Sequence, residues 1–205
     1  MYSCAQCALH SCKEENPDKL PANCPMQDKS RYDEWLEVYR QDENENFYVK
    51  SAELEADGYG QWGRLKETME FCKMMGYKRV GIAFCMGLRK EAKVIDSLFR
   101  KAGFTPVSVI CKTGGIPKEA MGIAKEKKLE PDAFEAMCNP IAQAKLLNEQ
   151  HTEFNILVGL CVGHDSLVNK YSTAPVTTLI AKDRVLAHNP AGAVYCAESY
   201  YKDKL

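Results

Sequence analysis

Short, almost continuous apolar runs recur in the C-terminal part of the chain and predict strands that are buried on both faces. The runs are RVGIAFC at 79–85, TPVSVIC at 105–111, FNILVGLC at 154–161 and APVTTLIAKD at 174–183. Each run has about the length of a strand, and the missing polar alternation is typical of a parallel sheet that is covered on both sides. The pattern therefore predicts about four parallel strands.

Segments with helical periodicity separate these runs. LRKEAKVIDSLFRKAG places Leu88, Ile95 and Phe99 on one face and closes at Gly103, while PIAQAKLLNEQ and HDSLVNKYS predict two further helices. We also expect one or two helices after the Gly-Gly pair of ICKTGG, and a closing helix in NPAGAVYCAESYY. Strands that alternate with helices imply right-handed crossovers, so the expected fold is α/β, with a doubly wound, mostly parallel, Rossmann-like sheet.

The N-terminal part has a different pattern. Residues 1–28 are rich in cysteine and proline and lack apolar periodicity, whereas 29–76 carries apolar positions at helical spacing and ends at Gly76, a residue suited to closing a helix. We therefore expect a cysteine-rich metal-binding segment at 1–28, a helical segment at 29–76 packed on the core, and an α/β domain at 77–205.

Charge and hydropathy exclude several classes of function. The net charge of −1 and the pI near 6.4 give no electrostatic reason to expect nucleic acid or an anionic membrane as a partner. The apolar runs are too short to cross a bilayer, and the first residues lack the pattern of a signal peptide. We therefore expect a cytoplasmic protein whose oligomeric state the sequence leaves open.

Ten cysteines make the chain unusual for a cytoplasmic protein. Disulfides are disfavoured in a reducing compartment, so closely spaced cysteines there indicate metal or thiol chemistry. A secreted protein with a disulfide framework is the competing interpretation, and the missing export signal argues against it.

Four cysteines lie close together near the N-terminus, in the spacing C-x2-C-x4-C-x11-C-P. They are Cys4, Cys7, Cys12 and Cys24, and His10 lies among them as a possible substitute ligand. A C-x2-C pair lets two thiolates from one tight turn bind the same metal, and two more complete a tetrahedral site or hold an iron–sulfur cluster. The spacing does not distinguish zinc from iron–sulfur.

A second set of cysteines follows from the expected fold. Cys85, Cys111 and Cys161 each end a predicted parallel strand, and Cys138 precedes a predicted helix. Ligands of open α/β sheets bind outside the carboxyl ends of the strands, so these thiols are expected to converge on one crevice. We expect an iron–sulfur cluster there, with 4Fe–4S favoured, or another metal, with Cys138 as the candidate fourth ligand.

Thiol catalysis is the alternative for the same crevice. Cys161, His164 and Asp165 have the residue types of a nucleophile, a base and an orienting acid, although the spacing straddles a strand-to-helix turn. Cys72 lies on the apolar face of a helix and Cys196 lies in the last helix, so both are expected to pack rather than bind metal.

Several segments resemble a known family. CAQCALHSC, ICKTGGIP, MCNPIAQAKLLN and LVGLCVGHDSLVNKYSTAPVTTLIAKDRVLAHNP are similar to the family named domain of unknown function 1847, and the resemblance covers nearly the whole chain. It implies cysteine-based metal binding in proteins mostly from anaerobes, which makes oxygen-sensitive clusters plausible. It transfers no catalytic residue.

Three functions remain open from the sequence. The first is an iron–sulfur protein that transfers electrons to a redox partner protein or reduces a small-molecule substrate at the inner site. The second is a zinc-binding module with a structural metal, whose α/β domain binds a small molecule or a partner. The third is a thiol enzyme that uses Cys161.

Overall fold

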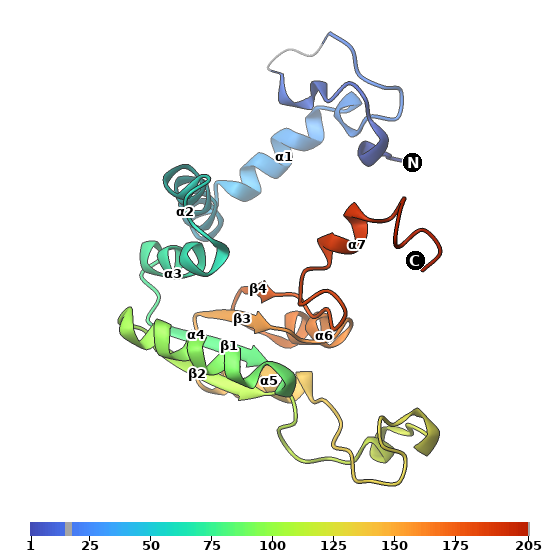
Figure 1. Ribbon diagram of the computed structural model, residues 1–205. Helices are drawn as coiled ribbons and strands as arrows, with labels where there is room; N and C mark the ends of the chain where they lie inside the picture. The colour runs from blue at the N-terminus through green and yellow to red at the C-terminus, as the bar shows by residue number, and fades with distance from the viewer. Residues whose placement is uncertain (15–17, 205) are drawn as a thin grey trace. The chain divides into compact units, whose positions relative to one another are not determined.

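A computed structural model describes residues 1–14 and 18–204 (Figure 1). The chain forms two compact units, Met1–Glu53 and Leu54–Leu205. The boundary lies inside helix α2 (Asp42–Gly58), and so inside the expected helical segment 29–76 rather than at either of its ends.

The N-terminal unit begins with short turns and continues with helices. Three single-turn 3-10 helices, Cys4–Gln6, Ser11–Lys13 and Pro25–Gln27, carry or flank its cysteines, and α1 (Ser30–Tyr39) follows. Acidic side chains in the first turn of α2 interact favourably with the positive end of the helix dipole, which stabilises the helix. Helices α1 and α2 confirm the helical structure that the sequence predicts after residue 29.

The second unit contains a four-stranded, wholly parallel sheet, as the apolar runs predict. The strands are β1 (Arg79–Phe84), β2 (Thr105–Ile110), β3 (Phe154–Val158) and β4 (Val176–Ile180), in the spatial order β2-β1-β3-β4. Each strand stops before the end of its apolar run, so the cysteines follow the strands instead of ending them. The α/β fold class is thus confirmed.

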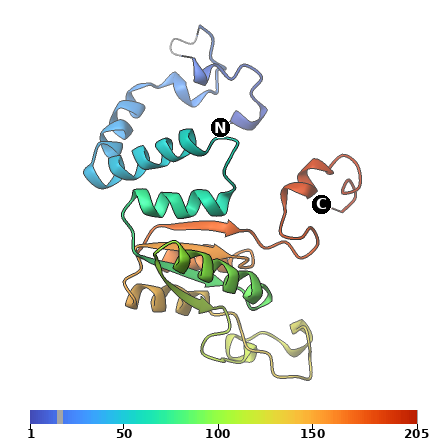
Figure 2. The same ribbon diagram turned by 60° about the vertical axis from the view of Figure 1, so that its left-hand side comes forward.

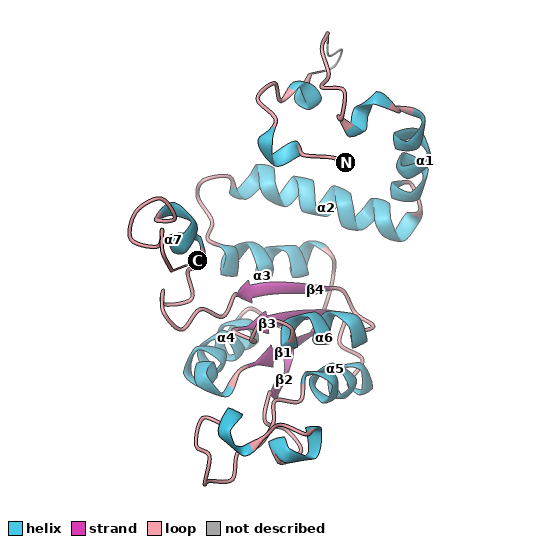
Figure 3. Ribbon diagram, turned by 90° about the vertical axis from the view of Figure 1, so that its right-hand side faces the viewer, coloured by secondary structure: helices cyan, strands magenta, loops and turns pink. Residues whose placement is uncertain are grey.

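Helices cover both faces of the sheet. Figure 3 shows α4 (Arg89–Lys101) on one side, and α5 (Pro140–Glu149) and α6 (His164–Tyr171) on the other, where α5 and α6 also pack together. Helix α3 (Arg64–Met74) runs alongside β4 and is held there by Arg64, whose side chain donates to the Thr178 carbonyl at 2.8 Å.

Alternate strand positions build the two halves of the core. Ala83 and Leu157 face α5 and α6 and pack with Ala144, Leu147 and Val168 in one buried cluster. The neighbouring residue of β3, Ile156, is also fully buried, because both sheet faces are covered by helices. Aromatic contact between Phe71 of α3 and Phe154, with ring centroids 5.5 Å apart, adds to the core.

The ends of α3 and α4 match the sequence expectation. Gly76 and Gly103 have positive φ angles of 72° and 92°. After Gly76, the Tyr77 N–H donates to the Cys72 carbonyl at 2.9 Å, which closes the last turn of α3. Glycine is suited to both positions because a Cβ atom strains this backbone conformation.

One helix prediction is wrong, and another gives a helix that is too long. Between β2 and α5 the described chain contains only 3-10 turns, at Lys118–Met121 and Lys125–Lys127, because Gly122 and the prolines interrupt any longer helix. The closing helix is also shorter than expected. Helix α7 spans Ala191–Tyr195 and is followed by turns, and it buries no residue that could stabilise a longer helix.

The segment between β2 and α5 leaves the sheet as an arm, which we define as residues 112–137 (Figure 2). An antiparallel bridge between Pro117 and Ala136 pairs its two limbs. Its base is closed by the Asn139 N–H, which donates to the Cys111 carbonyl at 2.7 Å. Cys111 and Cys138 therefore lie at the base of the arm.

Candidate functional site

Four cysteines line a single cavity at the carboxyl edge of the sheet. Cys85 follows β1, Cys111 follows β2, Cys138 precedes α5 and Cys161 lies in the loop after β3. The cavity has a volume of about 640 Å³. The structure thus brings together the four thiols that the sequence assigns to one crevice, while their role as ligands stays a prediction.

A glycine turn directs the end of β3 into this cavity. Gly159 has a φ of +63°, and a Cβ atom there would lie 2.6 Å from the Leu88 side chain. The Cys161 carbonyl then accepts the backbone N–H groups of His164, at 2.9 Å, and Asp165, at 3.2 Å. These bonds connect the loop that carries Cys161 to the first turn of α6.

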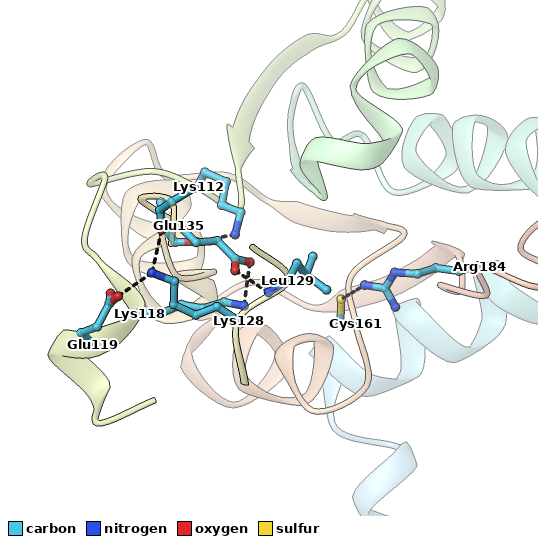
Figure 4. A network of polar contacts seen from close by, with 10 residues as sticks. Lys112, Lys118, Glu119, Lys128, Leu129, Glu135, Cys161 and Arg184 are labelled. Carbon is cyan, nitrogen blue, oxygen red and sulfur yellow. Dashed lines mark hydrogen bonds and ion pairs between the residues drawn. The ribbon is translucent and has the colours of Figure 1, made fainter. Parts of the chain in front are cut away.

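Three of the thiols interact directly. Cys111 shares hydrogen bonds with both Cys85 and Cys138, and it accepts a further one from the Met86 N–H at 3.3 Å. Cys161 lies on the same cavity but takes a different partner, the Arg184 guanidinium, with Nη2 3.0 Å from its sulfur (Figure 4). The inner set therefore divides into a group of three thiols and one separate thiol.

The interactions divide the three thiols by charge. A hydrogen bond from Cys111 lowers the pKa of Cys85 to about 4, helped by the Gly87 N–H and by Lys182. The same kind of bond from Cys111 lowers the pKa of Cys138 to about 5, helped by the charges of Lys112 and His164. The pKa of Cys111 is raised by its hydrogen bonding with Cys138 and Cys85, which share its single proton, and by burial. In the metal-free protein, one thiol therefore carries its proton between two thiolates.

Two cations after β4 belong to the site, and the sequence interpretation missed them. Lys182 Nζ lies 3.2 Å from the Cys85 sulfur, and Arg184 contacts Cys161. A tight loop positions Arg184, because the Asp183 carboxylate accepts two backbone N–H groups and the Asp183 N–H donates to His188 Nδ1 at 3.1 Å. The rule that located the cysteines at strand ends also applies to the residues after β4, and it could have found both cations.

Gln143 is a second residue that the sequence did not single out. It is completely buried, and its Nε2 donates to the Phe84 carbonyl at 3.2 Å and the Val109 carbonyl at 2.7 Å. Its Oε1 has no partner in the described part of the chain. Because Phe84 precedes Cys85 and Val109 lies two residues before Cys111, Gln143 fixes the backbone that carries these two thiols.

The N-terminal cysteines also share a cavity, of about 490 Å³, which Cys4, Cys7, Cys12 and Cys24 line together with His10. The Cys7 N–H donates to the Cys4 carbonyl at 3.1 Å, which forms the tight turn of the C-x2-C pair. Asn23 Nδ2 donates to Ser3 Oγ at 2.6 Å and so links the turn to the loop of Cys24. The structure places these residues around one cavity, while their role as metal ligands stays a prediction.

Neither set is preformed as a complete metal site. Within residues 1–14 and 18–204, no three His, Cys, Asp or Glu side chains lie close enough together to hold a metal ion. The donor chemistry of the inner set nevertheless fits an anionic thiolate cluster, because backbone and cationic N–H groups already point at three of the sulfurs. Such hydrogen bonds to sulfur are what tune iron–sulfur clusters.

The geometry for thiol catalysis at Cys161 is not formed. In the described chain, no hydrogen bond joins the Cys161 sulfur to His164, although both residues line the cavity. The Asp165 carboxylate accepts its neighbouring Ser166 N–H instead of orienting an imidazole. Cys72, as expected, is completely buried, and burial raises its pKa to about 12.

Together, the fold and the cavity define a doubly wound α/β protein with a thiol-lined cavity at the carboxyl edge of its sheet. The chain belongs to the family described as protein of unknown function (DUF1847), whose family model matches residues 24–179. This confirms the resemblance found in the sequence. The matched region includes the four inner cysteines and, from the N-terminal set, Cys24.

One relative extends the comparison. The chain is 51% identical over 170 residues to an uncharacterized protein of Methanocaldococcus jannaschii, and the match covers 83% of this chain and 85% of that protein.

As a separate structural finding, no helix in the described residues is both long and apolar enough to span a membrane.

Proposed function

We propose that this protein binds an iron–sulfur cluster, with 4Fe–4S favoured, at the inner thiols and uses it for electron transfer or for redox chemistry on a small molecule. The observation that carries the proposal is the convergence of Cys85, Cys111, Cys138 and Cys161 on one cavity. A cytoplasmic location, where reduced thiols persist, is part of the proposal.

The division of the thiols supports a cluster in preference to a structural zinc ion. A structural zinc ion has four protein ligands around it, whereas here three thiols interact and Cys161 is hydrogen-bonded to Arg184 instead. The three interacting thiols would be the first ligands, and Cys161 the fourth if it leaves Arg184. A bound cluster supplies reversible one-electron chemistry; Lys182 and Arg184 would balance the thiolate charge.

The N-terminal set is proposed as a second metal site. Its four thiols come from short turns that lie within 1–28, and they surround a smaller cavity. Zinc is the simpler occupant, because tetrahedral Cys4 sites are typical of short C-x2-C segments, and an iron–sulfur cluster is the alternative. In either case this metal would stabilise a segment that has little core of its own.

The test is the metal content of protein that has been purified without oxygen. The proposal predicts several irons and sulfides per chain and a broad absorption band near about 400 nm. Cys111→Ser should remove most of this iron because Cys111 lies between Cys85 and Cys138. The matched control is Cys72→Ser, since Cys72 is buried away from the cavity and should leave the iron content unchanged.

Two results would contradict the proposal. One is a colourless protein with zinc as its main metal, which would favour a zinc-binding module. The other is unchanged iron in Cys111→Ser, which would show that the inner thiols are not the ligands.

A further inference from the structure

The thiols account for only part of the wall of the inner cavity. The arm supplies apolar side chains, including Met121, Ile123, Leu129 and Met137, and α5 adds Ile141. Two of these residues are unusually exposed for their type, since Leu129 is 87% and Met121 65% accessible. A volume of about 640 Å³ falls within the range of sites that hold small organic molecules.

The charged groups around the cavity are mostly cationic. Among the described residues that line it, Glu135 is the one carboxylate, against Lys112, Lys118, Lys182 and Arg184. Glu135 is already paired, because its Oε1 lies 2.6 Å from Lys118 Nζ and both side chains are largely buried. The other three cations form no ion pair with a carboxylate in the part of the chain that the structure describes.

The present partner of Arg184 leaves it able to bind an anion. Lys112 Nζ donates to the Ala136 carbonyl, and its charge already lowers the pKa of Cys138. Arg184 is exposed and gives one N–H to the Cys161 sulfur, and a guanidinium has five such donors in a planar fork that suits an oxyanion.

The arm is held in shape by its own ion pairs. Lys128 Nζ lies 2.6 Å from both Glu119 Oε1 and the Ala133 carbonyl, and Glu135 accepts the Leu129 N–H at 2.9 Å (Figure 4). These contacts fix the conformation of the arm, so its apolar side chains stay beside the cavity. Among them, Leu129 is almost fully exposed. The cavity wall therefore combines cationic and apolar side chains.

We propose that the inner cavity binds a small organic molecule that carries an oxyanion head on an apolar body. Arg184 binds the head, and Met121 and Leu129 contact the body. Where the bound molecule is taken as the substrate of the cluster, this inference rests on the proposed function. The binding itself depends only on the side chains of this protein.

The test is calorimetric titration of the anaerobically purified full chain with matched probes. Hexanoate and hexyl phosphate present the two oxyanion heads on one apolar body, while hexanamide keeps the body and removes the charge. Either anion should bind at least about tenfold more tightly than hexanamide, since the head makes charge-assisted hydrogen bonds. The better of the two anions identifies the head as carboxylate or phosphate.

Two pairs of variants locate the site. Arg184→Met should weaken binding of the better anion by about tenfold or more, and Arg89→Met, an exposed arginine outside the cavity wall, should not change it. Leu129→Glu should abolish binding, because it places a carboxylate on the apolar wall. Its control is Phe134→Glu, another exposed residue of the arm that does not line the cavity.

Iron analysis of the same samples separates this inference from the proposed function. Iron-loaded protein that binds neither anion, or binds hexanamide equally well, overturns the inference and leaves the cluster standing. Iron-free protein that binds an anion through Arg184 and Leu129 supports the inference while the cluster proposal fails. Equal losses in Leu129→Glu and Phe134→Glu would also overturn it, because binding would then not involve the cavity.

Discussion

At the scale of single residues, the inner site depends on how Cys111 shares its proton. Hydrogen bonding with Cys111 lowers the pKa of both Cys85 and Cys138, while the same bonding and burial raise the pKa of Cys111. The sequence predicted that these thiols meet, because each adjoins the carboxyl end of a strand or the start of a helix. The same rule could have located Lys182 and Arg184 after β4, but not which thiol each one contacts. Gln143 could not be predicted, because its contacts depend on the packing of α5.

Alkylation of the metal-free protein tests this division of charge. Cys85 and Cys138, with pKa values of about 4 and about 5, are already deprotonated at pH 6, so their rates should stay nearly constant up to pH 8. An ordinary thiol with a pKa of about 8.5 would instead react about tenfold faster per pH unit over that range. Mass spectrometry after timed treatment with iodoacetamide measures each site.

Cys72 is the internal control for that experiment, because it is buried and its pKa is raised to about 12, so it should stay unmodified throughout. A steep rise of the Cys85 and Cys138 rates between pH 6 and pH 8 would show that both are ordinary thiols. The proton would then not reside on Cys111.

Gln143 should contribute measurably to stability. Gln143→Leu removes the hydrogen bonds to the Phe84 and Val109 carbonyls, and we expect the free energy of unfolding to fall by about 1–3 kcal/mol. Urea denaturation measures this change. Gln150→Leu, an exposed glutamine near the end of the same helix, should change stability by less than about 0.5 kcal/mol. Equal effects would mean that the buried amide does not support the strand ends.

At the scale of elements, the sequence predicted the strands and the amphipathic helices. It did not predict the structure of segments that lack an apolar stripe. The four runs form four parallel strands, of which the central β1 and β3 are buried between helical layers while β2 and β4 at the edges are only partly buried. The arm was wrongly expected to be helical. It is held by ion pairs such as Lys118–Glu135 and by one antiparallel bridge, and these contacts leave no periodic pattern in the sequence.

The end of α5 offers a direct test of backbone strain. His151 has a φ of 51° and occupies the position that Gly76 occupies in α3, with the following Thr152 N–H donating to the Leu147 carbonyl at 3.3 Å. His151→Gly should raise the free energy of unfolding by about 0.5–1 kcal/mol, because relief of the left-handed strain exceeds the entropy that glycine adds to the unfolded chain. Thermal unfolding should show a rise of roughly 2–4 °C.

The matched variant for His151→Gly is Gly76→Ala, which introduces a Cβ atom at the same kind of position, with a φ of 72°. It should lower the melting temperature. A lower melting temperature for His151→Gly as well would show that the His151 side chain contributes more than its backbone costs.

At the scale of the whole molecule, the two cysteine sets lie in different compact units, Met1–Glu53 and Leu54–Leu205. If each set holds its own metal, loss of one metal should not affect the content of the other. We therefore expect Cys7→Ser to remove the N-terminal metal and to leave the inner iron unchanged, as elemental analysis of anaerobically purified protein would show. Loss of both metals in Cys7→Ser would mean that the units are coupled.

The most direct test of the inner cluster uses Cys7→Ser protein, in which the N-terminal site is removed, and follows its absorption near about 400 nm during anaerobic reduction with dithionite. If the inner thiols hold a redox-active iron–sulfur cluster, the band is present, bleaches on reduction and returns on reoxidation, and Cys7→Ser combined with Cys111→Ser lacks it. A band that survives in the double variant, or Cys7→Ser protein with no band and no iron, would contradict the account.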